Sequence, residues 1–126
     1  MNYINTTSCS FSDYINGSSN TFIKCPPFSK ILDIQVRNYM LNITYQSPDY
    51  VNVYNSNFSD FKTFNFIVLV GLTQNNKSIP DFFEYFDTIK VFEDERVEYY
   101  HVFIQEIKTI QEIRDGKIDE LMDQEF

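Results

Sequence analysis

The sequence predicts an α+β fold: a small antiparallel sheet of three to four strands over about residues 31–73, followed by two helices, about 79–92 and 95–123. Apolar and polar residues alternate in the first region, as strands with one buried face require. In the second region apolar residues recur every three or four positions, which is typical of amphipathic helices. Residues 1–30 are expected to be irregular, so we expect a single domain over 31–126 with an N-terminal segment or arm.

The N-terminal segment is rich in Ser, Thr and Asn and has turn signals at Asn16-Gly17 and Pro26-Pro27. We expect its aromatic residues to hold a surface segment against the domain. The alternative is an N-terminal arm that docks on a neighbouring subunit. The four aromatic residues in question are Phe11, Tyr14, Phe22 and Phe28.

The expected sheet begins with alternating apolar residues over residues 31–36. The apolar positions change parity after Arg37-Asn38, which indicates a bulge or a tight turn, because a shift of one residue moves side chains to the opposite face. A second strand, a turn and a short strand over about residues 50–54 follow. These short connections favour an antiparallel meander.

Residues 61–73 contain the strongest predicted strand. Its early part alternates at Phe64 and Phe66, whereas the stretch from Ile67 to Leu72 is apolar on both faces. A strand without a polar face is typical of a central or helix-covered position in a sheet.

The first predicted helix, about 79–92, begins near Ser78, where a cap oxygen, Pro80 and Asp81 follow one another. The acidic run of residues 93–95 breaks the apolar pattern and is expected to end the helix. The prediction of this helix is based on the spacing of the apolar residues Phe82, Phe83, Phe86 and Ile89.

The second predicted helix, about 95–123, has a clear apolar face, but Asp115-Gly116 interrupts its sequence. Three outcomes are open there: the helix ends, it continues through a glycine that costs about 1 kcal/mol, or a hairpin turns between Ile113 and Ile118. We favour a long helix, continuous or broken once at Gly116. Its apolar face comprises Val97, Tyr100, Phe103, Ile104, Ile107 and Ile110.

The net charge of −8 is unevenly distributed. Residues 1–80 contain four acidic and five basic residues, whereas residues 81–126 contain fourteen acidic and five basic ones. An acidic half repels phosphate, and the other half has no Lys or Arg cluster, so we expect no nucleic acid and no membrane among the partners.

The N-terminus shows no signal peptide and the longest apolar run is too short to cross a bilayer. We expect a cytoplasmic or virion location, or an extracellular one if the chain is a trimmed ectodomain.

Cys9 and Cys25 are far too few for a disulfide-rich scaffold, and we expect two isolated thiols, with a disulfide in an oxidising compartment as the alternative. Five N-x-S/T triplets follow from the abundance of Asn, Ser and Thr, and would be glycosylation sites only in an ectodomain. They begin at Asn5, Asn16, Asn42, Asn57 and Asn76.

Signals for catalysis and metal binding are weak. His101 is the one histidine, and three glycines are too few for a phosphate-binding loop. The cysteines and His101 lack the paired spacing of zinc ligands. An EF-hand loop centred on Gly116 would require oxygen ligands where Ile113 and Met122 stand. We therefore expect a chain that is not an enzyme, with no catalytic residue, metal, cofactor or small-molecule substrate; a small hydrolase built on carboxylates or His101 is the least favoured alternative.

The 13 Phe and 9 Tyr exceed what a domain of this size can bury, and Tyr is enriched at interfaces. We expect a non-catalytic structural or assembly protein that forms homo- or hetero-oligomers; its bias towards Phe, Tyr, Asn, Ile and Lys suggests an AT-rich genome, as in a virus or phage. The candidate interface is Phe82, Phe83, Tyr99, Tyr100, Phe103 and Ile107. The alternative is an acidic inhibitor or immunity-type protein that covers a basic surface of its target with Glu93, Asp94, Glu95 and Glu98.

Overall fold

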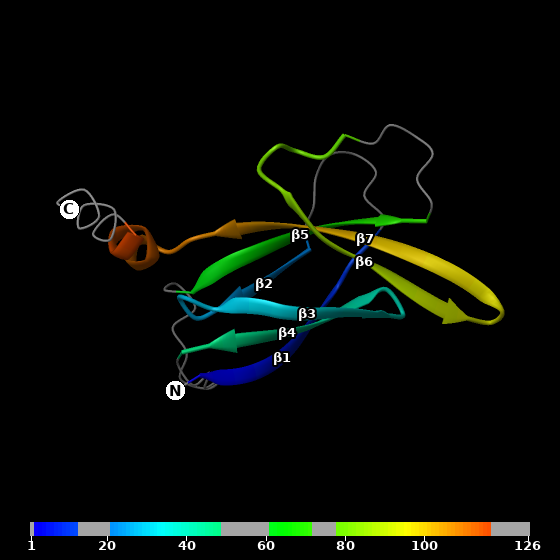
Figure 1. The fold of residues 1–126 in the computed structure, drawn as a ribbon, viewed down its shortest axis with the longest axis horizontal. Helices are drawn as coiled ribbons and strands as arrows, with labels where there is room; N and C mark the ends of the chain where they lie inside the picture. Colours follow the sequence, from blue (N-terminus) through cyan, green and yellow to red (C-terminus); the bar gives the residue numbers. More distant parts are fainter. Residues whose placement is uncertain (1, 13–20, 49–60, 72–77, 117–126) are drawn as a thin grey trace, which may run out of the picture.

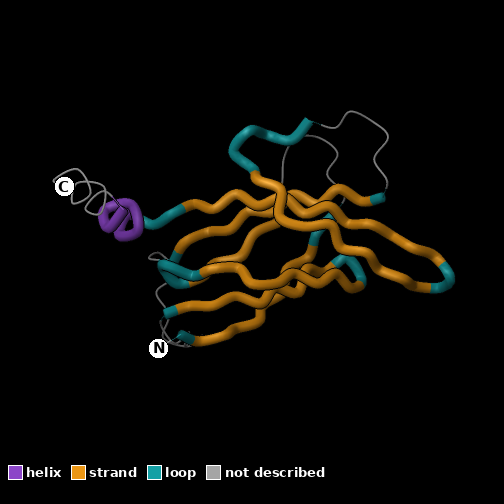
Figure 2. Tube along the Cα trace, viewed as in Figure 1, coloured by secondary structure: helices purple, strands orange, loops and turns teal. Residues whose placement is uncertain are grey.

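The computed structural model describes residues 2–12, 21–48, 61–71 and 78–116, and this part of the chain is mainly β-structure (Figure 1). Strands β1, β4 and β3 form one antiparallel sheet in that order, and β2, β5, β7 and β6 form a second one. A short helix of residues 110–116 follows the last strand (Figure 2). The strands are β1 (Tyr3–Ser10), β2 (Thr21–Cys25), β3 (Lys30–Arg37), β4 (Met40–Ser47), β5 (Lys62–Val70), β6 (Glu84–Glu93) and β7 (Arg96–Ile107).

The two sheets face each other and enclose one hydrophobic core. Side chains alternate along each strand, so that β4 buries Leu41, Ile43 and Tyr45 and leaves the positions between them half-buried. The four-stranded sheet contributes Phe66 and Val102, both fully shielded from solvent. The architecture is therefore a β-sandwich, in which the inner faces of two sheets form the core. Further core residues are Phe11, Ile23, Cys25, Ile34, Val36, Phe64, Val68 and Tyr100.

The predicted α+β fold is wrong, because the two helices expected over 79–92 and 95–123 are largely the strands β6 and β7. This region is rich in β-branched and aromatic residues, which favour strands. Asp94 and Glu95 both have positive φ, 49° and 63°, as the two-residue type I′ turn of a hairpin requires. Within the described residues only 110–116 are helical, and the expected continuation beyond Gly116 lies outside them.

The apolar spacing misled because β7 is covered on both of its faces. Tyr100 and Val102 point into the inter-sheet core, whereas Phe103 packs on the opposite face against Ile67 and Leu69. Apolar residues on both faces of a strand satisfy a helical period as readily as a strand period. Spacing alone therefore could not separate the two structures.

The expectation of an irregular N-terminal segment is also wrong, since this segment contributes β1 and β2 to the two sheets. Phe11 is buried and packs edge-on against Tyr100, with ring centroids 5.7 Å apart. Phe11 thus holds this segment to the domain, whereas Phe22 and Phe28 are exposed. Tyr14 lies outside the described residues.

The strands predicted between residues 31 and 73 are confirmed in part. Asn38 and Tyr39, with φ of 51° and 58°, form the tight turn indicated by the change of parity. The predicted meander is wrong, because β5 joins the other sheet. As expected, β5 is central and covered on both faces, although Ile79 and Phe83 from a connecting segment, and no helix, cover its outer face. The short strand expected over 50–54 lies outside the described residues.

One hairpin extends past the rest of its sheet. The pairing of β5 with β7 ends at Val70 and Tyr100, and the Gly71 amide then donates to the Tyr99 carbonyl at 2.7 Å. Among the described residues, β6 and β7 pair only with each other beyond this point, and the two-stranded ribbon projects from the sandwich (Figure 1). We call residues 90–99 the hairpin end.

No helix in the described ranges is long and apolar enough to span a membrane.

Candidate functional site

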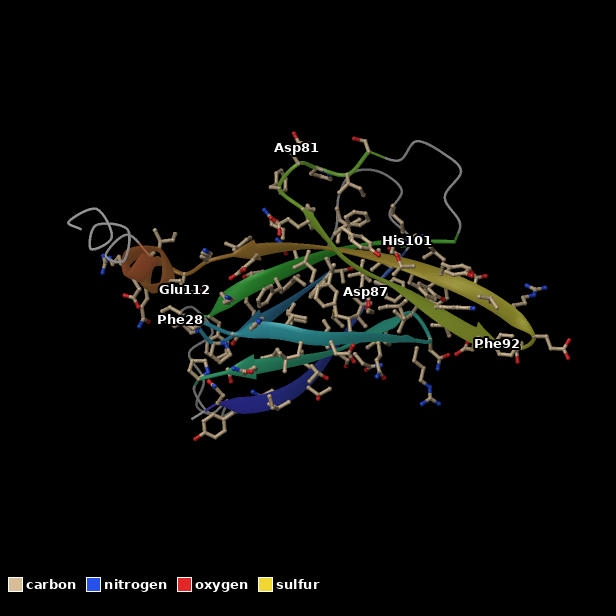
Figure 3. All side chains as sticks on the ribbon, viewed as in Figure 1. Phe28, Asp81, Asp87, Phe92, His101 and Glu112 are labelled. Carbon is tan, nitrogen blue, oxygen red and sulfur yellow. The ribbon has the colours of Figure 1, made fainter. Side chains whose placement is uncertain are left out.

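The hairpin end carries an exposed apolar pair. Phe92 on β6 lies directly opposite Val97 on β7, next to the pair of Lys90 and Tyr99 on the same face of the ribbon. Phe92 is 71% exposed and Val97 is 39% exposed. Figure 3 shows Phe92 near the tip of the hairpin, away from the sandwich. A large aromatic side chain on a projecting ribbon is the kind of group that fills a pocket on another protein.

The acidic residues predicted as a surface all lie at this hairpin end. Glu93 ends β6, Asp94 and Glu95 form the turn, and Glu98 lies opposite Val91 on β7. All four are exposed. The hairpin end also contains Lys90 and Arg96, so its net charge is −2. The turn of a hairpin, and not the beginning of a helix, brings these carboxylates to one end of the ribbon. Glu93 and Glu98 lie on the face opposite to Phe92 and Val97.

The residues of the predicted interface do not form one surface. Tyr100 lies in the inter-sheet core. Phe83 and Phe103 are partly buried on the outer face of the four-stranded sheet, where they cover Ile67 and Leu69. Tyr100, Phe83 and Phe103 therefore pack within the fold, where they stabilise it.

The other three predicted interface residues are more accessible. Phe82 is exposed and its ring lies 5.5 Å from that of Phe83. Ile107 is exposed at the end of β7. Tyr99 is half-buried and belongs to the hairpin end. Phe92 was not among the predicted interface residues, because the helical interpretation placed it at the end of a helix.

His101 is held by hydrogen bonds on both ring nitrogens. Its Nε2 lies 3.1 Å from the carbonyl oxygen of Gly71, which can only accept, so in the neutral imidazole Nε2 donates this bond. Nδ1 then accepts from the Thr88 hydroxyl at 2.9 Å, and the Tyr85 hydroxyl donates to the Thr88 oxygen at 2.7 Å. A catalytic triad would orient the imidazole with a carboxylate, whereas here a backbone carbonyl does so. His101 ties β7 to β6 and to the end of β5.

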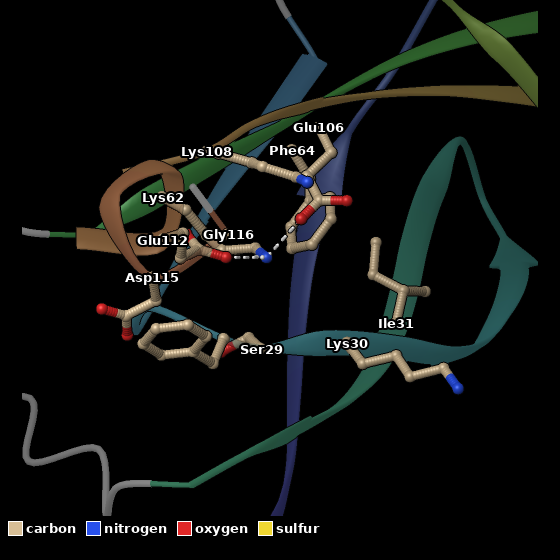
Figure 4. Close-up of a pocket in the computed structure, with 11 residues that line it drawn as sticks. Ser29, Lys30, Ile31, Lys62, Phe64, Glu106, Lys108, Glu112, Asp115 and Gly116 are labelled. Atoms are coloured by element: carbon tan, nitrogen blue, oxygen red, sulfur yellow. Dashed lines mark hydrogen bonds and ion pairs between the residues drawn. The ribbon is translucent and has the colours of Figure 1, made fainter. Parts of the chain in front are cut away.

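A buried cation lies at the opposite end of the sandwich, at the start of β5. Lys62 is only 3% exposed, and its ammonium lies 2.5 Å from a Glu106 oxygen, 2.9 Å from a Glu112 oxygen and 4.9 Å from the ring centre of Phe64 (Figure 4). Burial of an unpaired ammonium is very costly, so two carboxylates are needed to balance its desolvation. The cluster joins β5, β7 and the short helix.

The Lys62 cluster lines a groove. One cavity of about 460 Å³ lies around it, and a second of about 610 Å³ shares part of its lining, including Ile31 and Lys108. The lining mixes lysines and glutamates with apolar side chains, so the groove favours neither an anionic nor a cationic ligand. We assign the groove a structural role in docking the helix.

The helix of residues 110–116 begins with a capping box, Thr109-x-x-Glu112. The Thr109 amide donates to Glu112 Oε1 at 3.0 Å, and the Glu112 amide donates to the Thr109 hydroxyl at 3.2 Å. Burial alone would raise the pKa of Glu112, but hydrogen bonds from Lys62 and Thr109 and the charge of Lys62 lower it below its ordinary value. This local sequence signal could have located the start of the helix, although the pairing with Lys62, fifty residues away, has no local signal.

Acid is expected to detach the helix of residues 110–116 from the sandwich, because protonation of Glu112 removes its ion pair with Lys62. Because the pKa of Glu112 is lower in the folded chain, its contribution to stability is complete above pH 4.5 and is lost as the pH falls through the lowered value. Urea unfolding from neutral pH to below pH 4 should therefore show a smaller pH dependence for Glu112→Gln than for wild type. Identical pH profiles for the two chains would contradict this account.

Cys9 and Cys25 are free thiols, and both pack on the inner side of the sandwich. Burial raises the pKa of Cys9 to about 11 and that of Cys25 to about 12, the latter against the opposing charge of Lys62. Both thiols are therefore protonated at neutral pH, and neither is a reactive nucleophile.

Two of the five N-x-S/T triplets lie in the described strands. The Asn5 side-chain amide donates to the Ser47 hydroxyl at 3.0 Å and is thus engaged within the sheet. Asn42 lies on β4, half-buried. The triplets at Asn16, Asn57 and Asn76 lie outside the described residues.

Among the described residues there is no group of three or more His, Cys, Asp or Glu side chains placed to hold a metal ion.

Comparisons with protein-family models, with curated proteins and with solved structures found no match to this chain. The geometry of the chain itself is thus the basis for a functional proposal.

Proposed function

We propose that the chain is a non-catalytic binding protein that works through protein–protein contacts, with the hairpin end as its docking surface. The observation that carries this proposal is Phe92, 71% exposed and opposite the apolar Val97 on a ribbon that leaves its sheet. Exposed aromatic anchors of this kind carry much of the binding energy of protein interfaces. Lys62 and His101, by contrast, are engaged in contacts within the fold.

The chemistry of the hairpin end also describes its partner. Phe92 and Val97 require an apolar pocket, and the carboxylates of the adjoining turn, Asp94 and Glu95, favour basic side chains at the rim of that pocket. This complementarity supports both an assembly protein and an acidic inhibitor that covers a basic surface. The two functions differ in whether apolar or charged contacts carry the affinity.

Capture from the native source with immobilised full-length chain tests the proposal. A protein retained by wild type should be lost with Phe92→Ala, because truncation of a central aromatic anchor costs 2 kcal/mol or more, a roughly thirtyfold loss of affinity. Phe22→Ala is the matched control, since Phe22 is an exposed phenylalanine on the same sheet but outside the hairpin end. Retention that is equal for both variants would overturn the proposal.

Salt separates the two kinds of function. A partner that stays bound at about 1 M salt indicates apolar assembly contacts, because salt at this concentration screens exposed charges. Release at moderate salt, together with weaker binding by Glu93→Gln and Glu95→Gln, indicates the electrostatic inhibitor.

A further inference from the structure

Four strands form the edges of the two sheets, and three of these edges carry features that discourage pairing with another chain. Strand β3 has a bulge between Ile31 and Asp33, and β6 has one between Tyr85 and Asp87. Both also carry several charged side chains. Strand β2 is only five residues long, contains Lys24 and is followed by two prolines. Bulges, charges, prolines and short length are the usual protection of edge strands.

Strand β1 has none of these features. It is eight residues long, pairs with β4 in continuous register and contains no proline and no charged residue. Its neighbour β4 is likewise uncharged. Within the described ranges no strand pairs with the outer edge of β1, and Ile4 on its outer face is 61% exposed. An unprotected edge of this length is a template for a further strand.

We propose that residues 4–8 of β1 pair antiparallel with the same residues of a second copy of this chain, across a two-fold axis at Thr6, to form a continuous six-stranded sheet. Charge identifies the second copy as the occupant. Two copies of a chain with a net charge of −8 repel each other, and this repulsion is weakest where the contacting surfaces carry the fewest charges. Strands β6 and β7 together carry five acidic and two basic residues, whereas β1 and β4 carry none of either kind.

The pairing closes on itself. In the six-stranded sheet the two outer strands are both β3, whose bulge and charges protect the new edges. Growth therefore stops at a dimer, as an isologous contact requires. The hairpin end belongs to the other sheet and takes no part in this contact.

Sedimentation of the full chain over a range of concentrations tests the dimer. Wild type should associate to a dimer, and Thr6→Lys should weaken this dimer by at least about tenfold, because like charges then meet across the new strand pair. Thr44→Lys is the matched control: Thr44 lies opposite Thr6 on the same face, one strand away from the edge. Within residues 4–8, the backbone amides that point away from β4 should gain protection from hydrogen exchange as the concentration rises.

A wild-type chain that is monomeric at all concentrations would overturn the proposal, as would a dimer that the two lysine variants weaken equally. Loss of the dimer with Thr6→Lys should leave the partner binding of Phe92 intact, and Phe92→Ala should leave the dimer intact. The two proposals can therefore fail independently.

Discussion

Replacement of Lys62 by methionine is expected to destabilise the chain by about 3–5 kcal/mol, the usual cost of removing one partner from a buried ion pair. Glu112, whose side chain is only 7% exposed, would be left without the cation that balances its charge, and Phe64 would lose the ammonium over its ring. Because Glu112 also caps the helix of residues 110–116, part of the loss should appear as release of this helix. Urea unfolding followed by fluorescence measures the total effect.

Two further variants give this prediction its controls. The double variant Lys62→Met with Glu112→Leu should recover much of the stability, since a buried ion pair and an apolar pair of similar volume are often equally stable. The capping contact of Glu112 with Thr109 stays lost in this variant. Lys24→Met should cost less than about 1 kcal/mol, because the Lys24 side chain is exposed and its ammonium donates to the Thr63 hydroxyl, a neutral partner. A loss for Lys62→Met no greater than that for Lys24→Met would contradict the assigned role of Lys62.

Replacement of Phe66 by alanine is expected to cost about 3–5 kcal/mol, the range for phenylalanine truncation in a closely packed core. Phe66 is fully shielded from solvent at the middle of the central strand β5, with Thr21 and Ile104 opposite it on the two neighbouring strands. Phe92→Ala should change stability by less than about 0.5 kcal/mol, as exposed substitutions usually do. If the two truncations cost similar amounts, the core does not lie between the sheets as described.

The sequence supports prediction best where a strand has one polar and one apolar face. The alternation through β3 and β4, and the change of parity at Asn38, correctly placed two strands and the tight turn between them. The uninterrupted apolar stretch of β5 correctly indicated a central strand. Each of these signals arises from burial of a single strand and is therefore visible in a short window of sequence.

The same logic fails for β1 and β7 for opposite reasons. The inward positions of β1 include polar residues such as Asn5 and Thr7, since an edge strand is only half covered, so its apolar alternation is missing. Strand β7 has apolar residues on both faces, because Phe103 packs against Ile67 and Leu69 on the side away from the core. Which segment covers a strand is decided by tertiary packing, and it leaves no periodic trace in the strand's own sequence.

The candidate site could be predicted only where its members are close in sequence. The acidic residues from Glu93 to Glu98 fall at one place in either a helix or a hairpin, so their grouping survived the wrong secondary structure. Exposure of Phe92 depends on the hairpin running beyond β5, which is a property of the register and not of the sequence pattern. The contact of Lys62 with Glu112 joins residues fifty positions apart and needs the folded chain.

The footprint of a bound partner on the isotope-labelled chain, measured by NMR, tests the central claim most directly. The hairpin-end account predicts that the amide signals of residues 90–99 shift or broaden on binding, with the largest change at Phe92 and Val97, while the signals around Lys62 stay unchanged. Changes confined to the Lys62 groove, with Phe92 and Val97 unaffected, would contradict it.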